Sequence, residues 1–193
     1  MADTPSIPER KPTFKVVICG PAAVGKTCLV HRYLTGEFWK GSKSTIGIDF
    51  FLKHMVIEQE IAGIEDINGQ KIILQLWDFA GEDRFRKILP IYARGSHGVL
   101  LCFDLSEKET LSELGDWYSI IRRYLSPQTP IILMGLKEDL AASVSAMDIR
   151  QFLTNYKLVN YRSASSLTGN GVEEAYTFLT RAILASYQQF KNQ

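Results

Sequence analysis

Gly20-Pro-Ala-Ala-Val-Gly25-Lys26-Thr27 is the stretch that decides how the rest of the chain is interpreted. It follows the apolar run Phe14 to Cys19 and opens the amphipathic segment Lys26 to Leu34, so it predicts a turn between a buried strand and a helix. In such a loop backbone N–H groups surround phosphates, a lysine adds positive charge, and a hydroxyl at the helix start binds Mg²⁺. The sequence therefore predicts that a nucleoside triphosphate is bound by Ala22, Ala23, Val24, Gly25, Lys26, Thr27 and Cys28.

The composition is that of one ordinary globular domain. The chain has 193 residues, of which 46% are hydrophobic, and its 22 basic and 21 acidic residues give a formal net charge of +1. Such a balance provides no electrostatic basis for binding nucleic acid. We expect a flexible tail over residues 1–12, which contain three prolines, and a single domain over residues 13–190.

Cysteine usage predicts a cytoplasmic protein, and we expect it to be a monomer. Cys19, Cys28 and Cys102 are odd in number and lie in or beside apolar runs, which favours reduced thiols over a disulfide or zinc framework. No apolar run approaches the roughly 20 residues of a membrane helix, and the start lacks a signal-peptide pattern. With Ala2 after Met1 and no cysteine near Gln193, we expect no intrinsic lipid anchor, so that partners would mediate any membrane contact.

Alternating apolar runs and helical periodicities predict an α/β fold. Helical spacing marks Glu107 to Leu125 and a last helix from Val172 to Ile183. Strands are predicted at Phe14–Cys19, Gly98–Asp104, Pro130–Gly135 and, more weakly, Leu158–Tyr161. Asp49–Val56 and Lys71–Trp77 lack a crossover helix between them and predict an antiparallel hairpin joined by a long connection, Glu58 to Gln70. The expected architecture is a mostly parallel six-stranded sheet with one antiparallel edge hairpin and helices on both faces.

A second motif, Asp78-Phe79-Ala80-Gly81, ends the predicted hairpin. There a carboxylate can reach Mg²⁺ through water and a glycine N–H can meet a terminal phosphate. Together with the first loop and with the segments Ser44 to Phe50, Trp77 to Phe85 and Tyr92 to Gly98, it resembles a small GTPase of the Ras superfamily, nearest the Rab branch. The resemblance covers about residues 13–187 and implies the small G domain fold of P-loop NTPases, with GTP or GDP and Mg²⁺ bound.

The resemblance also implies how the switch works. Thr45 would join Mg²⁺ to the terminal phosphate, with Thr27 as a second ligand and Asp78 acting through water. Gly81 would sense the same phosphate by its N–H, so hydrolysis would free two segments. Phe38 matches the ring that packs edge-on against the base, although a loop aromatic touching the core is an equal interpretation.

Base recognition departs from the family pattern at one position. Leu136 replaces the asparagine that ordinarily helps to hold the base, whereas Lys137 can lie over the purine and Asp139 can accept two N–H bonds from guanine. We expect guanine to remain favoured at reduced affinity. A third base loop, Ala164 to Gly169, resembles the family's Ser-Ala-Lys segment, although by itself this stretch could equally be a helix-capping turn. The resemblance implies that Ser165, Ser166 and Leu167 bind the nucleotide, with the backbone N–H of Ser166 facing the guanine carbonyl.

Glu82 is the departure that most affects catalysis. Lys26, Gly81 and Glu82 occupy the catalytic positions, but a carboxylate stands where most relatives have a glutamine that orients the attacking water. Because an anion opposes the charge that develops on the phosphoryl oxygens, we expect slow or partner-dependent GTP hydrolysis. Two rivals stay open: a scaffold that binds GTP or GDP without turnover, and a P-loop protein that uses ATP.

Three aromatic residues predict a protein-binding surface. Phe50, Trp77 and Tyr92 match the triad through which Rab proteins meet effectors, while core packing is the alternative for each ring alone. The resemblance also implies an exchange factor and a GTPase-activating protein as partners. The connection Glu58 to Gln70 is about ten residues longer than in a typical Rab, which a surface loop tolerates at little entropic cost.

Overall fold

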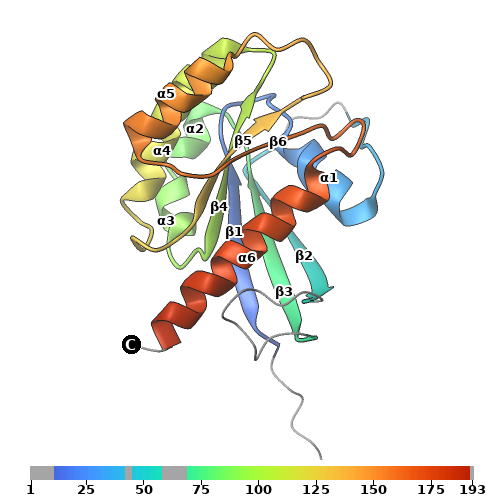
Figure 1. Ribbon diagram of the computed structural model, residues 1–193, viewed down its shortest axis with the longest axis vertical. Helices are drawn as coiled ribbons and strands as arrows, with labels where there is room; N and C mark the ends of the chain where they lie inside the picture. The colour runs from blue at the N-terminus through green and yellow to red at the C-terminus, as the bar shows by residue number, and fades with distance from the viewer. Residues whose placement is uncertain (1–10, 42–44, 58–68, 192–193) are drawn as a thin grey trace, which may run out of the picture.

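The computed structural model describes residues 11–41, 45–57 and 69–191 (Figure 1). In this part of the chain six strands form one sheet in the order β2-β3-β1-β4-β5-β6, and only the β2–β3 pair is antiparallel. This confirms the predicted fold class. The strands are β1 (Thr13–Cys19), β2 (Ile48–Val56), β3 (Lys71–Phe79), β4 (Gly98–Asp104), β5 (Ile131–Leu136) and β6 (Tyr161–Ala164).

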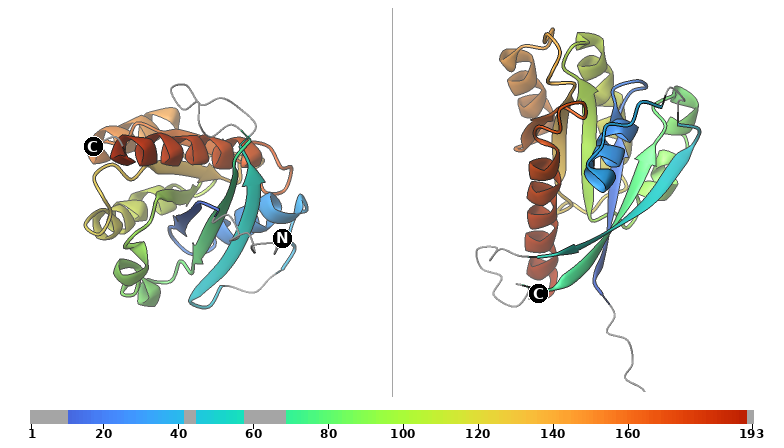
Figure 2. Two further views of the ribbon diagram at one scale, coloured as in Figure 1. Left: turned by 90° about the horizontal axis from the view of Figure 1, so that it is seen from below. Right: turned by 90° about the vertical axis from the view of Figure 1, so that its right-hand side faces the viewer.

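Helices cover both faces of the sheet, as Figures 1 and 2 show. One face packs against α1 (Lys26–Thr35) and α6 (Val172–Lys191), and the other against α3 (Leu89–Ala93), α4 (Lys108–Arg122) and α5 (Ala146–Tyr156). A single turn, α2 (Asp83–Arg86), follows β3. The last helix runs beyond the predicted stripe to Lys191, one residue past the expected end of the domain.

Alternation along the strands divides the apolar side chains into two cores. Val16 and Ile18 of β1 belong to the core under α1 and α6, whereas Val17 and Cys19 belong to the core under α4 and α5. Every residue of β4 and β5 is buried, as expected for central strands covered on both faces. These cores fix the carboxyl ends of the strands, where the motifs lie.

Two local predictions were incomplete. The last strand begins at Tyr161, three residues later than predicted, because Leu158 N–H bonds to Leu153 O at the end of α5 and Val159 is 87% exposed. The helix α5 was not predicted at all. It begins with a capping box in which Ser145 and Asp148 satisfy each other's backbone N–H groups.

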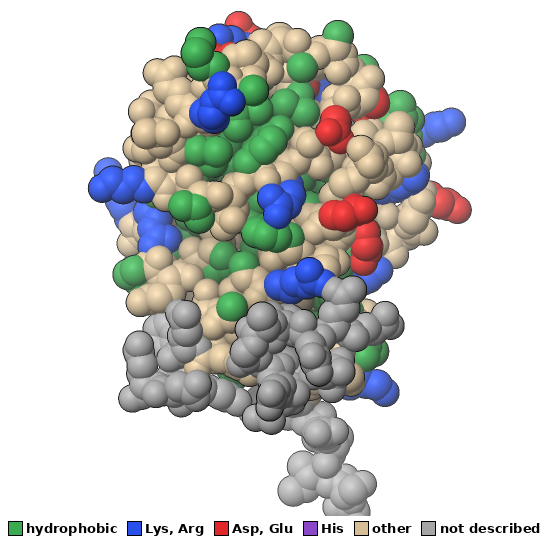
Figure 3. Space-filling model, viewed as in Figure 1, with side chains coloured by type: hydrophobic (Ala, Val, Ile, Leu, Met, Phe, Trp, Pro, Cys, Tyr) green, Lys and Arg blue, Asp and Glu red, His purple; other side chains and the backbone are tan. Residues whose placement is uncertain are grey.

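Surface and thiol chemistry agree with the composition. Cys19 and Cys102 are buried, Cys28 is half-buried, and all three are free thiols as predicted. The face in Figure 3 carries side chains of both charges. No helix among the described residues is long and apolar enough to cross a membrane. Most of the predicted tail, Ser44 and residues 58–68 of the long connection lie outside the described residues.

Candidate functional site

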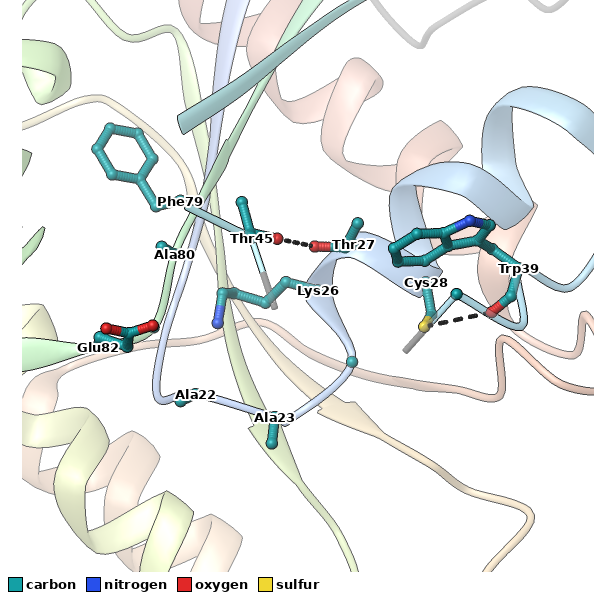
Figure 4. A pocket seen from close by; sticks show the side chains of 13 residues that line it. Ala22, Ala23, Lys26, Thr27, Cys28, Trp39, Thr45, Phe79, Ala80 and Glu82 are labelled. Atoms are coloured by element: carbon teal, nitrogen blue, oxygen red, sulfur yellow. Dashed lines mark hydrogen bonds between the residues drawn. The ribbon is translucent and has the colours of Figure 1, made fainter. Parts of the chain in front are cut away.

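A pocket of about 340 Å³ opens where β1 and β3 end, next to the start of α1 (Figure 4). This is the crevice at the carboxyl ends of parallel strands where α/β sheets bind ligands. Glu82 lies at one end of the pocket in Figure 4 and Trp39 at the other, with Lys26 and Thr27 between them. Its lining consists of Ala22, Ala23, Gly25, Lys26, Thr27, Cys28, Trp39, Gly41, Thr45, Phe79, Ala80, Gly81 and Glu82.

The loop between β1 and α1 has a backbone shaped for anions. Gly25 precedes the first turn of α1 with φ 103, and Ala23 adopts φ 60, a left-handed conformation that is unfavourable for a residue with a Cβ. Alternation of left- and right-handed residues turns successive N–H groups toward one side. Gly20 is required because a Cβ there would lie 2.1 Å from the carbonyl oxygen of Cys102.

Lys26 is buried and holds the loop together. Its Nζ donates hydrogen bonds to the carbonyl oxygens of Gly20 at 2.9 Å and Pro21 at 2.6 Å. Burial lowers the pKa of Lys26, and the nearby Asp78 carboxylate opposes that shift. Within the described part of the chain, this buried ammonium donates hydrogen bonds to neutral carbonyl groups alone, which places it favourably to bind an anion.

Three oxygen-bearing side chains from three segments meet beside Lys26. Thr27 Oγ1 lies 2.6 Å from Thr45 Oγ1 and donates to Asp78 Oδ2 at 2.5 Å. Asp78 is fully buried, and within the described residues its Oδ1 accepts no hydrogen bond. Hydroxyl and carboxylate oxygens are the donors that Mg²⁺ prefers, and a buried carboxylate with one oxygen unused suits a cation. Thr27, Thr45 and Asp78 therefore fit a magnesium ion.

Burial raises the pKa of Asp78 to about 6, against an ordinary value of 3.8, and the hydrogen bond from Thr27 only partly opposes this. The folded state then binds this proton more tightly than the unfolded state, so stability falls as pH rises from about 4 to about 6. For protein freed of nucleotide and Mg²⁺, we expect the Asp78 contribution to the free energy of unfolding to fall by about 1 kcal/mol between pH 5 and pH 7.

Urea denaturation of wild type and Asp78→Asn at the two pH values measures this contribution. His97, whose pKa is lowered by burial, changes stability with pH in the opposite direction, and the comparison of the two proteins removes its effect. Equal pH dependence in wild type and Asp78→Asn would contradict the expectation.

The segment after β3 packs directly on the phosphate loop. A Cβ at Gly81 would lie 2.3 Å from the backbone of Pro21 and Ala22, so only glycine permits this approach. The next residue, Glu82, lines the pocket, and its Oε2 forms an ion pair with Arg84 Nε at 2.7 Å. The predicted catalytic positions, Lys26, Gly81 and Glu82, thus surround one end of the pocket.

The predicted base residues lie in the loops after β5 and β6, outside the lining of this pocket. Ser165 Oγ donates to Asp139 Oδ1, and Lys137 Nζ lies 2.5 Å from Asp104 Oδ2. Ser166 is half-buried and Leu167 is exposed on the same loop as Ser165. The structure therefore brings Asp139 and Ser165 together, as a shared role in base binding requires.

Leu136 ends β5 and is nearly fully buried in the core under α1. Its Cδ1 is 3.9 Å from the position that a Cβ on Gly25 would occupy, so it packs beneath the phosphate loop. The loop after β5 therefore meets the phosphate loop through the apolar side chain of Leu136, at the position where the resemblance implies an asparagine.

Trp39, which the sequence analysis did not select, lines the pocket, whereas the predicted Phe38 is half-buried and does not. The Trp39 indole stacks on the His31 ring with centroids 4.8 Å apart and planes 16° apart. It also packs so closely on Gly41 that a Cβ there would lie 2.1 Å from the ring. An indole two residues before a glycine in a loop forms no motif, so spacing alone could not have identified it.

Replacing Trp39 by alanine should weaken nucleotide binding by about tenfold without unfolding the domain, because the variant loses an aromatic wall of the pocket. Titration with a fluorescent GDP analogue measures the dissociation constant, and thermal unfolding checks the fold. Trp39→Phe, which keeps an aromatic ring, serves as the matched control. Unchanged affinity in Trp39→Ala would exclude a contact with the ligand.

The three predicted surface aromatics form one cluster. Phe50 and Trp77 have ring centroids 5.0 Å apart, and Trp77 and Tyr92 have centroids 5.6 Å apart. Phe50 is 47% exposed, and Lys15 Nζ lies 4.8 Å from the Trp77 ring centroid. The cluster connects β2, β3 and α3, so movement of the segments beside the pocket would change its shape.

Comparisons with known proteins identify relatives of this chain over most of its length. A family model described as Ras family matches residues 15–185. Ras-related protein Rab-4 of Dictyostelium discoideum is 35% identical over 178 residues, which cover 90% of this chain and 82% of that protein. Human Ras-related proteins Rab-4B and Rab-4A are 34% and 36% identical over 173 residues, covering 89% of this chain and 76% and 74% of theirs.

Proposed function

The chain belongs to the Ras family and is a Rab-like small GTPase, and from that premise we propose that it is a Mg²⁺-dependent GTP/GDP switch that hydrolyses GTP slowly. The observation that carries the proposal is that Lys26, Thr27 and Thr45 line one pocket at the end of the phosphate loop, where Thr27 also donates a hydrogen bond to the buried Asp78. Thr27 lies in the first turn of α1, Thr45 precedes β2 and Asp78 belongs to β3, so three separate segments of the chain supply these oxygen atoms.

We assign the phosphates to the N–H groups of residues 22–28 and to Lys26, and Mg²⁺ to Thr27, Thr45 and, through water, Asp78. Support comes from the loop dihedral angles and from the unused Oδ1 of Asp78 among the described residues. When bound, Mg²⁺ would neutralise phosphate charge. The base is assigned to Asp139, Lys137 and the Ser165 loop, supported by the Asp139–Ser165 hydrogen bond. Phe38 stays a proposed base contact.

Slow hydrolysis is proposed from Glu82. A glutamine offers both an acceptor and an N–H donor, whereas a carboxylate offers acceptors and a negative charge near the transferring phosphoryl group. Glu82 lines the phosphate end of the pocket, so its charge would act where negative charge develops. Effectors would bind the Phe50, Trp77 and Tyr92 cluster, and an exchange factor and a GTPase-activating protein would set the state of the switch.

The function is tested by measurements on the purified protein: nucleotide identity, single-turnover hydrolysis and competitive displacement. The first is chromatography of the nucleotide released on denaturation, which should yield GDP or GTP. The second is single-turnover phosphate release from preloaded GTP with Mg²⁺. A rate equal to that of free GTP, with and without cell extract, would favour the scaffold, and equal displacement of a GDP analogue by ATP and GTP would favour the ATP-using protein.

A further inference from the structure

Glu82 does not face the pocket as an isolated anion. Its Oε2 accepts from Arg84 Nε at 2.7 Å, while the backbone oxygen of Glu82 accepts from Phe85 N at 2.9 Å. This backbone bond closes the turn that starts α2 and brings residue 84 over residue 82. Arg84 thus holds Oε2, and no described residue forms a hydrogen bond or ion pair with Oε1 of this pocket-lining side chain.

Arg84 is itself restrained by the neighbouring ring. Its guanidinium carbon lies 4.8 Å from the centroid of the Phe85 ring, and Phe85 Cε1 lies 3.9 Å from where a Cβ of Gly47 would stand. Gly47 is two residues from Thr45, which reaches Thr27 in the pocket. The ion pair is therefore connected to both segments expected to change with the nucleotide.

We propose that Arg84 is a positioning residue for GTP hydrolysis, acting through Glu82, an inference that rests on the proposed function. It neutralises the Glu82 carboxylate and directs the oxygen that it leaves free toward the attacking water. The water oxygen bonds to the terminal phosphorus, the bond to the bridging oxygen of GDP breaks with its electron pair, and the water protons leave with inorganic phosphate. Glu82 and Arg84 together would thus perform part of the water-orienting role that a single glutamine has in most relatives.

The Arg84–Glu82 ion pair contributes little to stability, so substitutions in it should change activity without unfolding the domain. The Arg84 side chain is 65% exposed and that of Glu82 is 37% exposed, and exposed ion pairs contribute little to folding. An uncompensated carboxylate beside a terminal phosphate instead opposes both GTP binding and the transition state. Removing Arg84 should therefore affect GTP and leave GDP binding unchanged.

A double-mutant cycle tests the proposal. Single-turnover GTP hydrolysis and the dissociation constants of GTP and GDP are measured for wild type, Arg84→Ala, Glu82→Gln and the double variant. We expect Arg84→Ala to slow hydrolysis and weaken GTP relative to GDP, each by about tenfold. Arg84→Lys should keep most of both. In the Glu82→Gln background, Arg84→Ala should have no effect. Lys87→Ala, which removes an exposed charge next to α2, is the control.

Each result decides one question. If Arg84→Ala matches wild type in both measurements, or loses as much in the Glu82→Gln background, Arg84 does not act through Glu82 and only this inference falls. If wild type binds GTP without hydrolysing it, the ratio of GTP to GDP affinity in the four proteins still shows whether Arg84 acts through Glu82. If wild type binds no guanine nucleotide, the proposed function falls and takes the inference with it.

Discussion

Replacing Lys26 by alanine is expected to lower the affinity for Mg²⁺–GTP by about two to three orders of magnitude. The Lys26 ammonium is buried and bonded to two carbonyl oxygens that carry no charge, so a phosphate is the anion that would complete its environment. Truncating one partner of a buried, hydrogen-bonded charge pair costs about 2–5 kcal/mol. Isothermal titration of nucleotide-free protein with GTP and Mg²⁺ measures the loss.

Lys87→Ala removes a lysine that is exposed and should leave the same affinity unchanged. Circular dichroism and thermal unfolding establish that Lys26→Ala is folded, since the carbonyl oxygens of Gly20 and Pro21 lose their donor. A folded Lys26→Ala protein that binds GTP as tightly as wild type would show that the phosphates lie elsewhere.

Replacing Asp139 by asparagine is expected to move base preference from guanine to xanthine, changing the ratio of the two affinities by about 100-fold or more. Ser165 Oγ donates to Asp139 Oδ1, a bond that the amide oxygen of asparagine can equally accept. The other atom of the group then becomes an N–H donor. Guanine presents donors at its N1 and exocyclic amino groups, whereas xanthine has a carbonyl oxygen at the latter position.

Competition of GTP, XTP and ATP against a fluorescent GDP analogue measures the ratio for wild type and Asp139→Asn. Asp116→Asn, on the exposed surface of α4, makes the same chemical change away from the site. If Asp139→Asn keeps the preference of wild type for guanine over xanthine, another group recognises the purine edge.

The fold could be predicted largely because its information is local. The phosphate loop needs one strand, one turn and one helix in sequence. Two strand-like runs without a crossover helix between them predicted the antiparallel pair at the edge of the sheet. Helix α5 escaped detection because it buries only Ile149 and Phe152. The start of β6 was misplaced because Leu158, apolar and strand-like in sequence, closes the end of α5.

The residues in and around the pocket were only partly predictable, because motif spacing identifies some of them and contacts in space identify the others. Motif spacing selected Lys26, Thr27, Thr45 and Asp78, and the structure places them together. Trp39 belongs to no motif, and Arg84, although it lies in the segment Trp77 to Phe85, had no role assigned to it from the sequence. The significance of both residues depends on contacts with His31 and Glu82. Charge on Glu82 was visible in the sequence, but its counter-ion became evident only from the turn that begins α2.

The contact of Leu136 with the phosphate loop affects how long a ligand stays. Losing a polar link between the two halves of the pocket costs about 1–3 kcal/mol, and differences in affinity among related complexes appear mainly in the dissociation rate. Guanine nucleotide should therefore leave this protein about 5- to 150-fold faster than it leaves a relative with asparagine at this position. Spontaneous exchange would then contribute, beside the proposed exchange factor, to how much of the protein carries GTP.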